Sequence, residues 1–418
     1  MRNNLRWTRI LAICFMVNVI GFASQQIISF AITTNMQKEL QMTASMLGVI
    51  SGIFSIGALF LQVKTSDLAN KSKSKGIITI LLLLSSFFNI AQGFSTSGMQ
   101  LLIFRFFTGF TGGGLCSALT VIITNWFPEK ERGKAFSNFF LSNGLTMVLM
   151  GPIVGIIAEK FGWRMLFYSL GVLNIIIAII WFVFITEKPE DAIWLSEEER
   201  IHILGDNKNI KKKENLKEKE EVKISIFDII KDRNIIKICI IICLFNLGMF
   251  GFGLWLPSLL GQISNSGLKT IGWLSVAPNI IVMIGLEVWG YISSKSNKIR
   301  LLTALPMFGF GILLAIGTFV NIVWINYIII CMASFFLQNA IIGINILPSK
   351  VVRNDIEGYV RGFINTFGAV GGFIGPWIVG IIKNITQSTN ISMLAVTIAL
   401  VIGGILCLTL PKEVDKFN

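Results

Sequence analysis

The sequence predicts an all-α integral membrane protein with twelve membrane-spanning helices in two six-helix bundles. Three observations predict it: the composition, the number of long apolar stretches and an internal repeat. Of the 418 residues, 53% are hydrophobic and only 14% are charged, so a water-soluble protein of this length could not cover its surface. Backbone polar groups must be paired in hydrocarbon, and the apolar stretches lack the alternation of barrel strands, so helices are the expected spanning elements.

The first half of the chain supplies six apolar stretches of the length that a spanning helix needs, about 20 residues. The first follows a short basic N-terminus and is too long for the core of a signal peptide, so we expect it to remain as a helix. The six helices are expected at residues 9–33, 45–63, 76–95, 99–123, 135–158 and 164–185.

A hydrophilic segment then separates the two halves. Its mixed charge, densest at residues 211–221, cannot bury a core and indicates a solvated linker. We therefore expect a first bundle at 1–186, a cytoplasmic charged linker at 187–233 and a second bundle at 234–418. The helices of the second bundle are expected at residues 235–258, 270–292, 300–320, 325–347, 361–383 and 392–410.

The two halves resemble each other at an offset of 224 residues. Residues 47–51 match 271–275, and Gly151-Pro152 matches Gly375-Pro376. An even number of helices in each repeat makes the halves parallel. Parallel six-helix repeats with a solute path between them indicate a secondary transporter that works by rocking of the halves.

The basic residues set the expected orientation. Most of the 36 lysines and arginines fall in the alternate loops of one side, which predicts a cell-membrane protein with both termini in the cytoplasm. Because the charge is segregated in this way, we expect membrane lipid and not nucleic acid as a partner. The six cysteines all fall in apolar stretches and are interpreted as buried small hydrophobic residues. The exceptions to the charge segregation are Lys38, Arg105, Lys160, Arg164, Lys269 and Lys383.

Several motifs resemble the anion:cation symporter family of the major facilitator superfamily. They are NWFPEKERG at 125–133, FGWR at 161–164, WLSEEER at 194–200, and the stretches at 251–257, 289–293 and 365–376. The resemblance spans nearly the whole chain. It implies the major facilitator fold, a cavity lined by the first, fourth, seventh and tenth helices, and a substrate such as a sugar acid, a dicarboxylate or a related organic anion.

Arg105 is the main candidate for a substrate-binding residue. An ionisable group deep in a spanning helix costs about 2.5–3.5 kcal/mol on insertion scales and is a functional candidate by default. The guanidinium fork suits a carboxylate, and the resemblance matches Arg105 to the arginine of the family's fourth helix. The alternative is a structural arginine satisfied by carbonyls or by a neighbouring helix.

Five amide side chains complete the predicted binding site. The amides of the cavity helices could bind the polar groups of a substrate, or could equally join neighbouring helices. The predicted residues are Gln25, Asn246, Gln338 and Asn339 of the cavity helices, and Asn365 of the eleventh helix.

Coupling and gating residues are less well matched to the family. Ser24-Gln25 and Gly112 stand where proton-coupled members carry ionisable residues, so the usual proton coupling is not expected, and H⁺ or Na⁺ remains open. Glu287 is predicted as a buried carboxylate that titrates during transport or pairs with a basic residue at the cytoplasmic rim. Asn70 and Lys71 lie in the gate loop, where Asn70 replaces the usual acidic residue.

These observations favour a monomeric permease that moves a small organic anion by alternating access. Two alternatives stay open: a carrier of a neutral or phosphorylated solute, and a membrane sensor of the same fold that has lost transport. The sequence shows no nucleophile motif, phosphate loop or metal motif, so an enzyme, a metal site and a cofactor are not expected.

Overall fold

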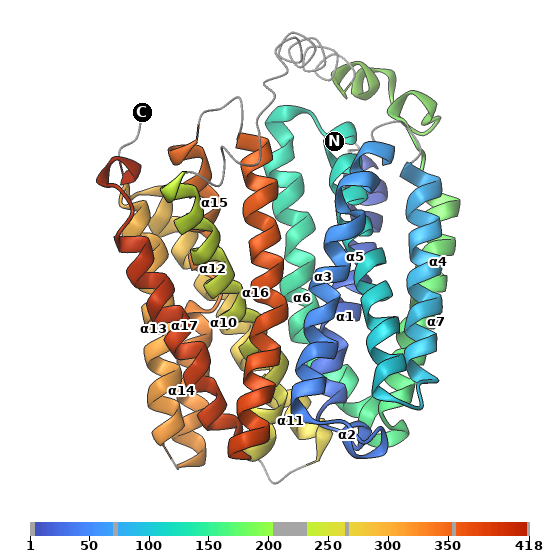
Figure 1. Ribbon diagram of the computed structural model, residues 1–418. Coiled ribbons are helices and arrows are strands. Elements are labelled where there is room, and N and C mark those ends of the chain that lie inside the picture. Colours follow the sequence, from blue (N-terminus) through green and yellow to red (C-terminus); the bar gives the residue numbers. More distant parts are fainter. Residues whose placement is uncertain are drawn as a thin grey trace.

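The computed structural model describes residues 5–69, 74–203, 232–263, 267–320, 322–352 and 357–415. Its long helices run side by side as one bundle, with both termini at the same end (Figure 1). We call this end the terminal end, and the opposite end, where α2 (Met36–Glu39) and α11 (Leu268–Leu274) lie, the far end.

Six spanning helices form the first half, and each lies within a few residues of its predicted position. The first begins with a short π-helical turn, η1 (Trp7–Leu11). The others follow in chain order. They are α1 (Ala12–Ala31), α3 (Ala44–Leu68), α4 (Ser74–Gly93), α5 (Gly98–Trp126), α6 (Glu129–Phe161) and α7 (Trp163–Phe184).

The second half repeats this order, but two of its six spanning segments are interrupted. The expected linker begins with the 3₁₀ turn η3 (Pro189–Asp191), and its residues 204–231 lie outside the described residues. The elements of the second half are α10 (Arg233–Ile263), α11 followed by α12 (Val276–Ser294), α13 (Ile299–Phe319), α14 (Val323–Phe336), α15 (Ala340–Val351), α16 (Glu357–Thr386), α17 (Thr389–Leu408) and η4 (Lys412–Asp415).

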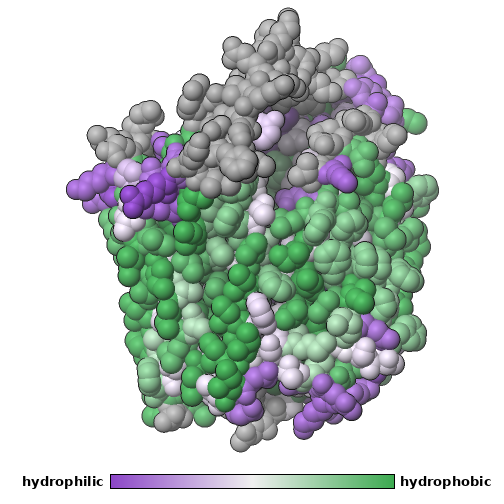
Figure 2. Space-filling view, viewed as in Figure 1, coloured by the Kyte–Doolittle hydropathy of each residue, from purple (hydrophilic) through white to green (hydrophobic). Residues whose placement is uncertain are grey.

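The surface confirms a membrane protein that crosses the bilayer many times. Among the described residues, twelve helical segments are long and apolar enough to span a membrane. Figure 2 shows hydrophobic side chains over the middle of the bundle and hydrophilic side chains gathered toward its two ends. Lipid is the solvent that such an apolar belt requires.

The first interruption, between α11 and α12, has a proline as its cause. Pro278 has no N–H to donate to the carbonyl of Leu274, four residues earlier. The Tyr327 hydroxyl of α14 donates to that carbonyl instead, at 2.9 Å. A side chain of a neighbouring helix therefore supplies the hydrogen bond that the break removes, because a backbone carbonyl inside a membrane needs a donor.

The second interruption separates α14 from α15 at residues 337–339. Here the backbone forms tighter bonds, from the N–H of Ile341 to the carbonyl of Gln338 and from Ile342 to Asn339. The Asn339 side chain donates back to the carbonyl of Phe335 at 2.8 Å, which competes with the helical ladder. The break leaves Gln338 at a kink in the wall between the halves.

The halves touch most closely at the far end, where small residues let helices cross. α3 meets α16 where Gly48 faces Pro376, and α11 meets α6 where Gly272 faces Gly151. A β-carbon at Gly48 or Gly272 would collide with the facing backbone, so glycine permits both crossings. The two crossings are related by the internal repeat, because Gly48 and Gly272 lie 224 positions apart.

Among the described residues, three hydrogen bonds join the halves near these crossings. One runs from the Asn279 side chain of α12 to the carbonyl of Met147 of α6 at 2.9 Å. The other two lie at helix starts, and we call them the far-end hydrogen bonds. The Glu159 carboxylate accepts from the backbone N–H of Lys269 at 2.7 Å, near the start of α11. The Asn384 side-chain oxygen accepts from the backbone N–H of Ala44 at 2.9 Å, at the start of α3. In each case one half satisfies an N–H that the first turn of a helix in the other half leaves free.

At the terminal end of the first half, the chain beyond α7 packs back onto the bundle. Arg6 is only 3% exposed and pairs with Glu131 at 2.9 Å and with Glu199 at 3.0 Å. Trp194 stacks on Trp126, with the ring centroids 5.5 Å apart. Burial raises the pKa of the Glu199 carboxyl, and the positive charge of Arg6 opposes that rise. The WLSEEER motif thus anchors this segment to the bundle.

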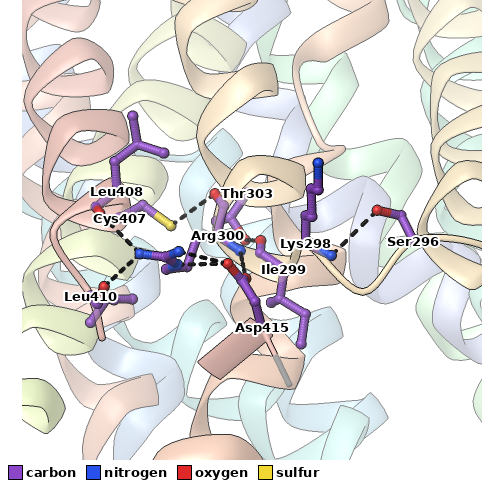
Figure 3. Close-up of polar contacts among 9 residues, drawn as sticks. All are labelled: Ser296, Lys298, Ile299, Arg300, Thr303, Cys407, Leu408, Leu410 and Asp415. Atoms are coloured by element: carbon purple, nitrogen blue, oxygen red, sulfur yellow. Dashed lines mark hydrogen bonds and ion pairs between the residues drawn. The ribbon is translucent and has the colours of Figure 1, made fainter. Parts of the chain in front are cut away.

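At the terminal end of the second half, η4 folds back onto the start of α13 (Figure 3). Arg300 pairs with Asp415 at 2.8 Å and donates to the carbonyl of Leu410 at 2.9 Å. The Cys407 thiol, which is fully buried, lies against the carbonyl of Arg300 at 3.4 Å. The C-terminal end of α17 is therefore capped by side-chain contacts of Arg300.

Candidate substrate cavity

A cavity of about 250 Å³ lies between the two halves, and we call it the central cavity. Its wall is formed by α1, α3 and α6 of the first half and by α10, the α14–α15 break and α16 of the second. Most ligand pockets are concave, largely apolar and carry a few placed polar groups. The polar lining residues here are Gln25, Gln26, Ser29, Ser51, Ser55, Asn143 and Gln338.

The open space narrows from the terminal end to the level of the helix crossings. Beyond them lies a separate opening of about 580 Å³ at the far end, which shares no lining residue with the central cavity. Toward the terminal end, a wider opening of about 450 Å³, the vestibule, shares Gln25 and Asn143 with the central cavity. Toward the far end, the space shrinks to about 40 Å³, in a constriction that shares Met147 and Leu337 with the central cavity. The central cavity is therefore reached from the terminal end, and the tight helix crossings close the far end.

Arg105 is fully buried in α5 and contacts the backbone of α1. Its NH1 group donates to the carbonyl of Ser24 at 2.5 Å, and its NH2 group donates to the carbonyl of Gln25. The guanidinium lies over the ring of Phe54, 4.9 Å from the centroid. Because Gln25 and Phe54 both line the vestibule, the charge of Arg105 lies directly behind the wall.

Among the described residues, Arg105 forms no ion pair. Its Nε group is buried and has no hydrogen-bond partner there. The two carbonyls carry only partial negative charges, so they compensate the full positive charge of the guanidinium incompletely in this low-dielectric setting. This arrangement favours an anion on the other side of the wall.

The structure brings four of the five predicted amides to the open space. Gln25 lines both the central cavity and the vestibule, and Gln338 lines the central cavity. Asn246 and Asn365 line the vestibule, where Asn246 also donates to the carbonyl of Gly368 at 2.9 Å. Asn339 differs: it is fully buried, donates to the carbonyl of Phe335 in α14 and lines none of the three spaces.

The predicted burial of Glu287 is wrong, because its side chain is exposed. It lies one turn beyond Met283, which packs against Gly144 of α6, and it lines none of the three spaces described above. The described residues contain no ion pair of Glu287 with a basic residue. The predicted gate residues Asn70 and Lys71 lie outside the described residues.

Sequence reasoning missed the contribution of α3 and α6 to the wall. Asn143 of α6 lines both spaces and accepts a hydrogen bond from the Asn18 side chain of α1 at 2.8 Å. Ser55 of α3 also lines both spaces. An asparagine in the middle of an apolar helix was the available signal for Asn143. The predicted burial of the cysteines is wrong for Cys116, which is exposed and lines the vestibule.

The wall offers hydrogen bonds and one hidden positive charge. No charged residue lines the central cavity, the vestibule or the constriction within the described chain. The described residues also hold no group of three or more His, Cys, Asp or Glu that could share a metal ion. The arrangement suits binding and release of a small molecule.

Comparison with known proteins gives a family match. The family model of the Major Facilitator Superfamily matches residues 12–376. Among solved structures, the chain superposes on a bacterial homologue of the human lysosomal transporter Spinster with a TM-score of 0.79 at 13% identity, covering 98% of both chains. At this identity the likeness concerns the fold.

Three curated relatives are similar over most of their length. A quinolone resistance transporter of Acinetobacter baumannii is 24% identical, with 88% of this chain and 86% of the relative covered. A putative tartrate transporter of Agrobacterium vitis is 23% identical, with 98% and 91% covered. A hexuronate transporter of Bacillus subtilis is 24% identical, with 90% and 88% covered.

Proposed function

Since the chain belongs to the Major Facilitator Superfamily, we propose that it is a secondary transporter that moves a small organic anion, a sugar acid or another carboxylate, by alternating access. The observation that carries the anion assignment is Arg105, a buried positive charge without an ion pair in the described chain, directly behind the cavity wall. The relatives named for tartrate and hexuronate support the same class.

The proposed path runs through the central cavity. Gln25 and Gln338 contact the substrate there, Asn246 and Asn365 contact it in the vestibule, and Arg105 supplies the attraction. At an effective dielectric constant of 20, two unit charges about 4 Å apart attract by about 4 kcal/mol, and the attraction falls off with distance. An anion on the α1 wall therefore gains from Arg105 even without a direct bond.

The proposed orientation places both termini in the cytoplasm, on the side that carries most of the basic residues. With that orientation the narrowing of the space toward the far end describes an inward-facing carrier. The division into 1–186, 187–233 and 234–418 belongs to the same proposal. Glu287, exposed on α12, is the proposed coupling or gate residue, with H⁺ or Na⁺ as the candidate ion.

Uptake into proteoliposomes tests the proposed function. Labelled tartrate, glucuronate and other carboxylates are offered with and without an imposed pH gradient, to the wild type and to Arg105→Gln. We expect uptake of at least one acid by the wild type and its loss in the variant. The matched control is Arg164→Gln, an arginine at the far end that is outside the three spaces of the path. Uptake that is indifferent to Arg105 contradicts the anion assignment.

A further inference from the structure

The wall of the central cavity is divided between the halves by polarity. Six of its nine lining residues from the first half are polar, namely Gln25, Gln26, Ser29, Ser51, Ser55 and Asn143. Of the nine from the second half, only Gln338 is polar. The cavity therefore has a hydrogen-bonding face on one half and an apolar face on the other.

The apolar face is built mainly by α10 and the region around the α14–α15 break. Met249, Phe250 and Leu254 come from α10, and Leu337 and Ile341 flank the break. These side chains offer dispersion contacts and no strong hydrogen bond. A hydroxyl held against this face would lose its water without gaining a partner, at a cost of about tenfold or more in affinity.

The positive charge of Arg105 lies on the polar side of the central cavity only. Arg105 bonds to the carbonyl of Gln25, whose residue lines the polar face. No second cation lines the central cavity in the part of the chain that the structure describes. A second carboxylate at the opposite end of a substrate would therefore meet apolar side chains in place of a positive charge, which is unfavourable.

We propose that the central cavity takes a monocarboxylate with an apolar body, held with its carboxylate on the α1 side and its aliphatic or aromatic part against α10. This inference rests on the proposed function and narrows its substrate class. A polyhydroxylated diacid would find hydrogen-bond partners mainly on the polar face of the wall, which is only half of it. The cavity volume of about 250 Å³ restricts the ligand to a small molecule.

Ligand-induced thermal stabilisation of the purified full-length protein tests the proposal on the wild type. The probes are 3-phenylpropionate, gluconate, galactarate and the neutral alcohol 3-phenylpropanol. We expect 3-phenylpropionate to stabilise at a concentration at least about tenfold below that of gluconate or galactarate, and 3-phenylpropanol to be weaker than the acid. Exchange of labelled 3-phenylpropionate in proteoliposomes then separates transport from binding.

The outcomes distinguish this inference from the proposed function. If gluconate or galactarate stabilises more strongly than 3-phenylpropionate, the apolar-body inference is overturned and the organic-anion carrier stands. If no acid stabilises the protein or exchanges, or if the alcohol matches its acid, both are overturned.

A pair of substitutions at Met249 tests the apolar face itself. Met249→Gln keeps the side-chain length but adds an amide, and we expect it to weaken 3-phenylpropionate by about tenfold without weakening gluconate. Met249→Leu keeps the apolar character and is expected to retain the wild-type preference. Equal loss in both variants would show that shape alone matters at this position and would overturn the assignment of the apolar face.

Discussion

At the scale of single residues, Arg105 shows how a buried positive charge is held between spanning helices. Its guanidinium holds two carbonyls of α1 and rests on Phe54, so its position is fixed by at least three contacts. The same contacts fix the backbone of Gln25, the residue that lines both the central cavity and the vestibule. Under the proposed function, Arg105 therefore combines a charge for the substrate with the positioning of a wall residue.

Arg105→Lys separates these two roles. Lysine keeps the charge but lacks the planar fork that bonds two carbonyls at once. We expect an apparent affinity for the transported acid about tenfold weaker in Arg105→Lys and about a hundredfold or more weaker in Arg105→Gln. Concentration-dependent exchange in proteoliposomes measures both, and Arg164→Lys serves as control. Identical behaviour of the lysine and glutamine variants would show that the charge alone contributes nothing.

Glu39 provides a residue-scale prediction on stability and pH. Trp163 donates to its carboxylate at 2.7 Å and Arg164 pairs with it, and these bonds lower the pKa of Glu39 from its ordinary value of 4.5. A lowered carboxyl pKa stabilises the folded protein above pH 4.5, and the stabilisation is lost as the pH falls through the lowered value.

We therefore expect Glu39→Gln to be less stable than the wild type at pH 7, by about 0.5 kcal/mol because the pair is exposed to solvent. The difference should shrink as the pH falls below 4.5. Thermal unfolding in detergent at several pH values measures it, with Glu198→Gln as the charge-matched control. A gap that widens in acid would contradict the assignment of the ion pair.

At the scale of helices, the interruptions and crossings determine where the bundle can open. The far-end hydrogen bonds exist only while the halves are together at that end, because donor and acceptor come from different halves. Replacing Glu159 or Asn384 by alanine removes one acceptor each, at a cost of about 1 kcal/mol. The equilibrium should shift away from the state with an open vestibule by about fivefold.

Alkylation of Cys116 reports this shift, because the thiol is exposed in the vestibule. Cys243 and Cys331, which are partly exposed, are first replaced by alanine. We expect slower alkylation in Glu159→Ala and Asn384→Ala, and a near wild-type rate in Glu159→Gln, which keeps an acceptor oxygen. An unchanged rate in both alanine variants would show that the helix crossings and the Asn279–Met147 hydrogen bond keep the far end closed without these two bonds.

The break between α11 and α12 gives a second helix-scale prediction. Tyr327→Phe leaves the carbonyl of Leu274 without its donor, and we expect a loss of about 1–2 kcal/mol in stability. Pro278→Ala restores an N–H that can bond to the same carbonyl, so the tyrosine substitution should cost less in that background. A double-mutant cycle by thermal unfolding measures the coupling, and additive effects would contradict it.

At the scale of the whole molecule, the sequence predicted the architecture better than the site. Long apolar stretches gave the number and order of the spanning helices, because lipid imposes length and composition directly. The kinks at residues 275 and 337–339 were not predicted, since they depend on partners such as Tyr327 that only the folded chain brings near. The burial of Arg105 was predicted, and its two carbonyl contacts match the alternative of a structural arginine. Which carbonyls it meets, and the exposure of Glu287, depend on helix rotation, which apolar stretches do not specify.

The orientation of the whole molecule yields a further prediction. In the background where Cys243 and Cys331 are alanine, a membrane-impermeant maleimide should label Cys116 faster in inside-out vesicles than in right-side-out vesicles. The reason is that the vestibule opens at the terminal end, which we place in the cytoplasm. Faster labelling of right-side-out vesicles would contradict the orientation, the resting state or both. The substitution Cys116→Ala is the control for background labelling.

The paired contacts at the far end have a consequence for assembly. Glu159 and Asn384 lie 225 positions apart, as do Ala44 and Lys269, so each half carries both an acceptor and a donor surface. A patch that recognises a copy of itself is the interface of a two-fold symmetric homodimer. The junction is thus built like the interface of a two-fold homodimer, although both of its halves lie in a single polypeptide.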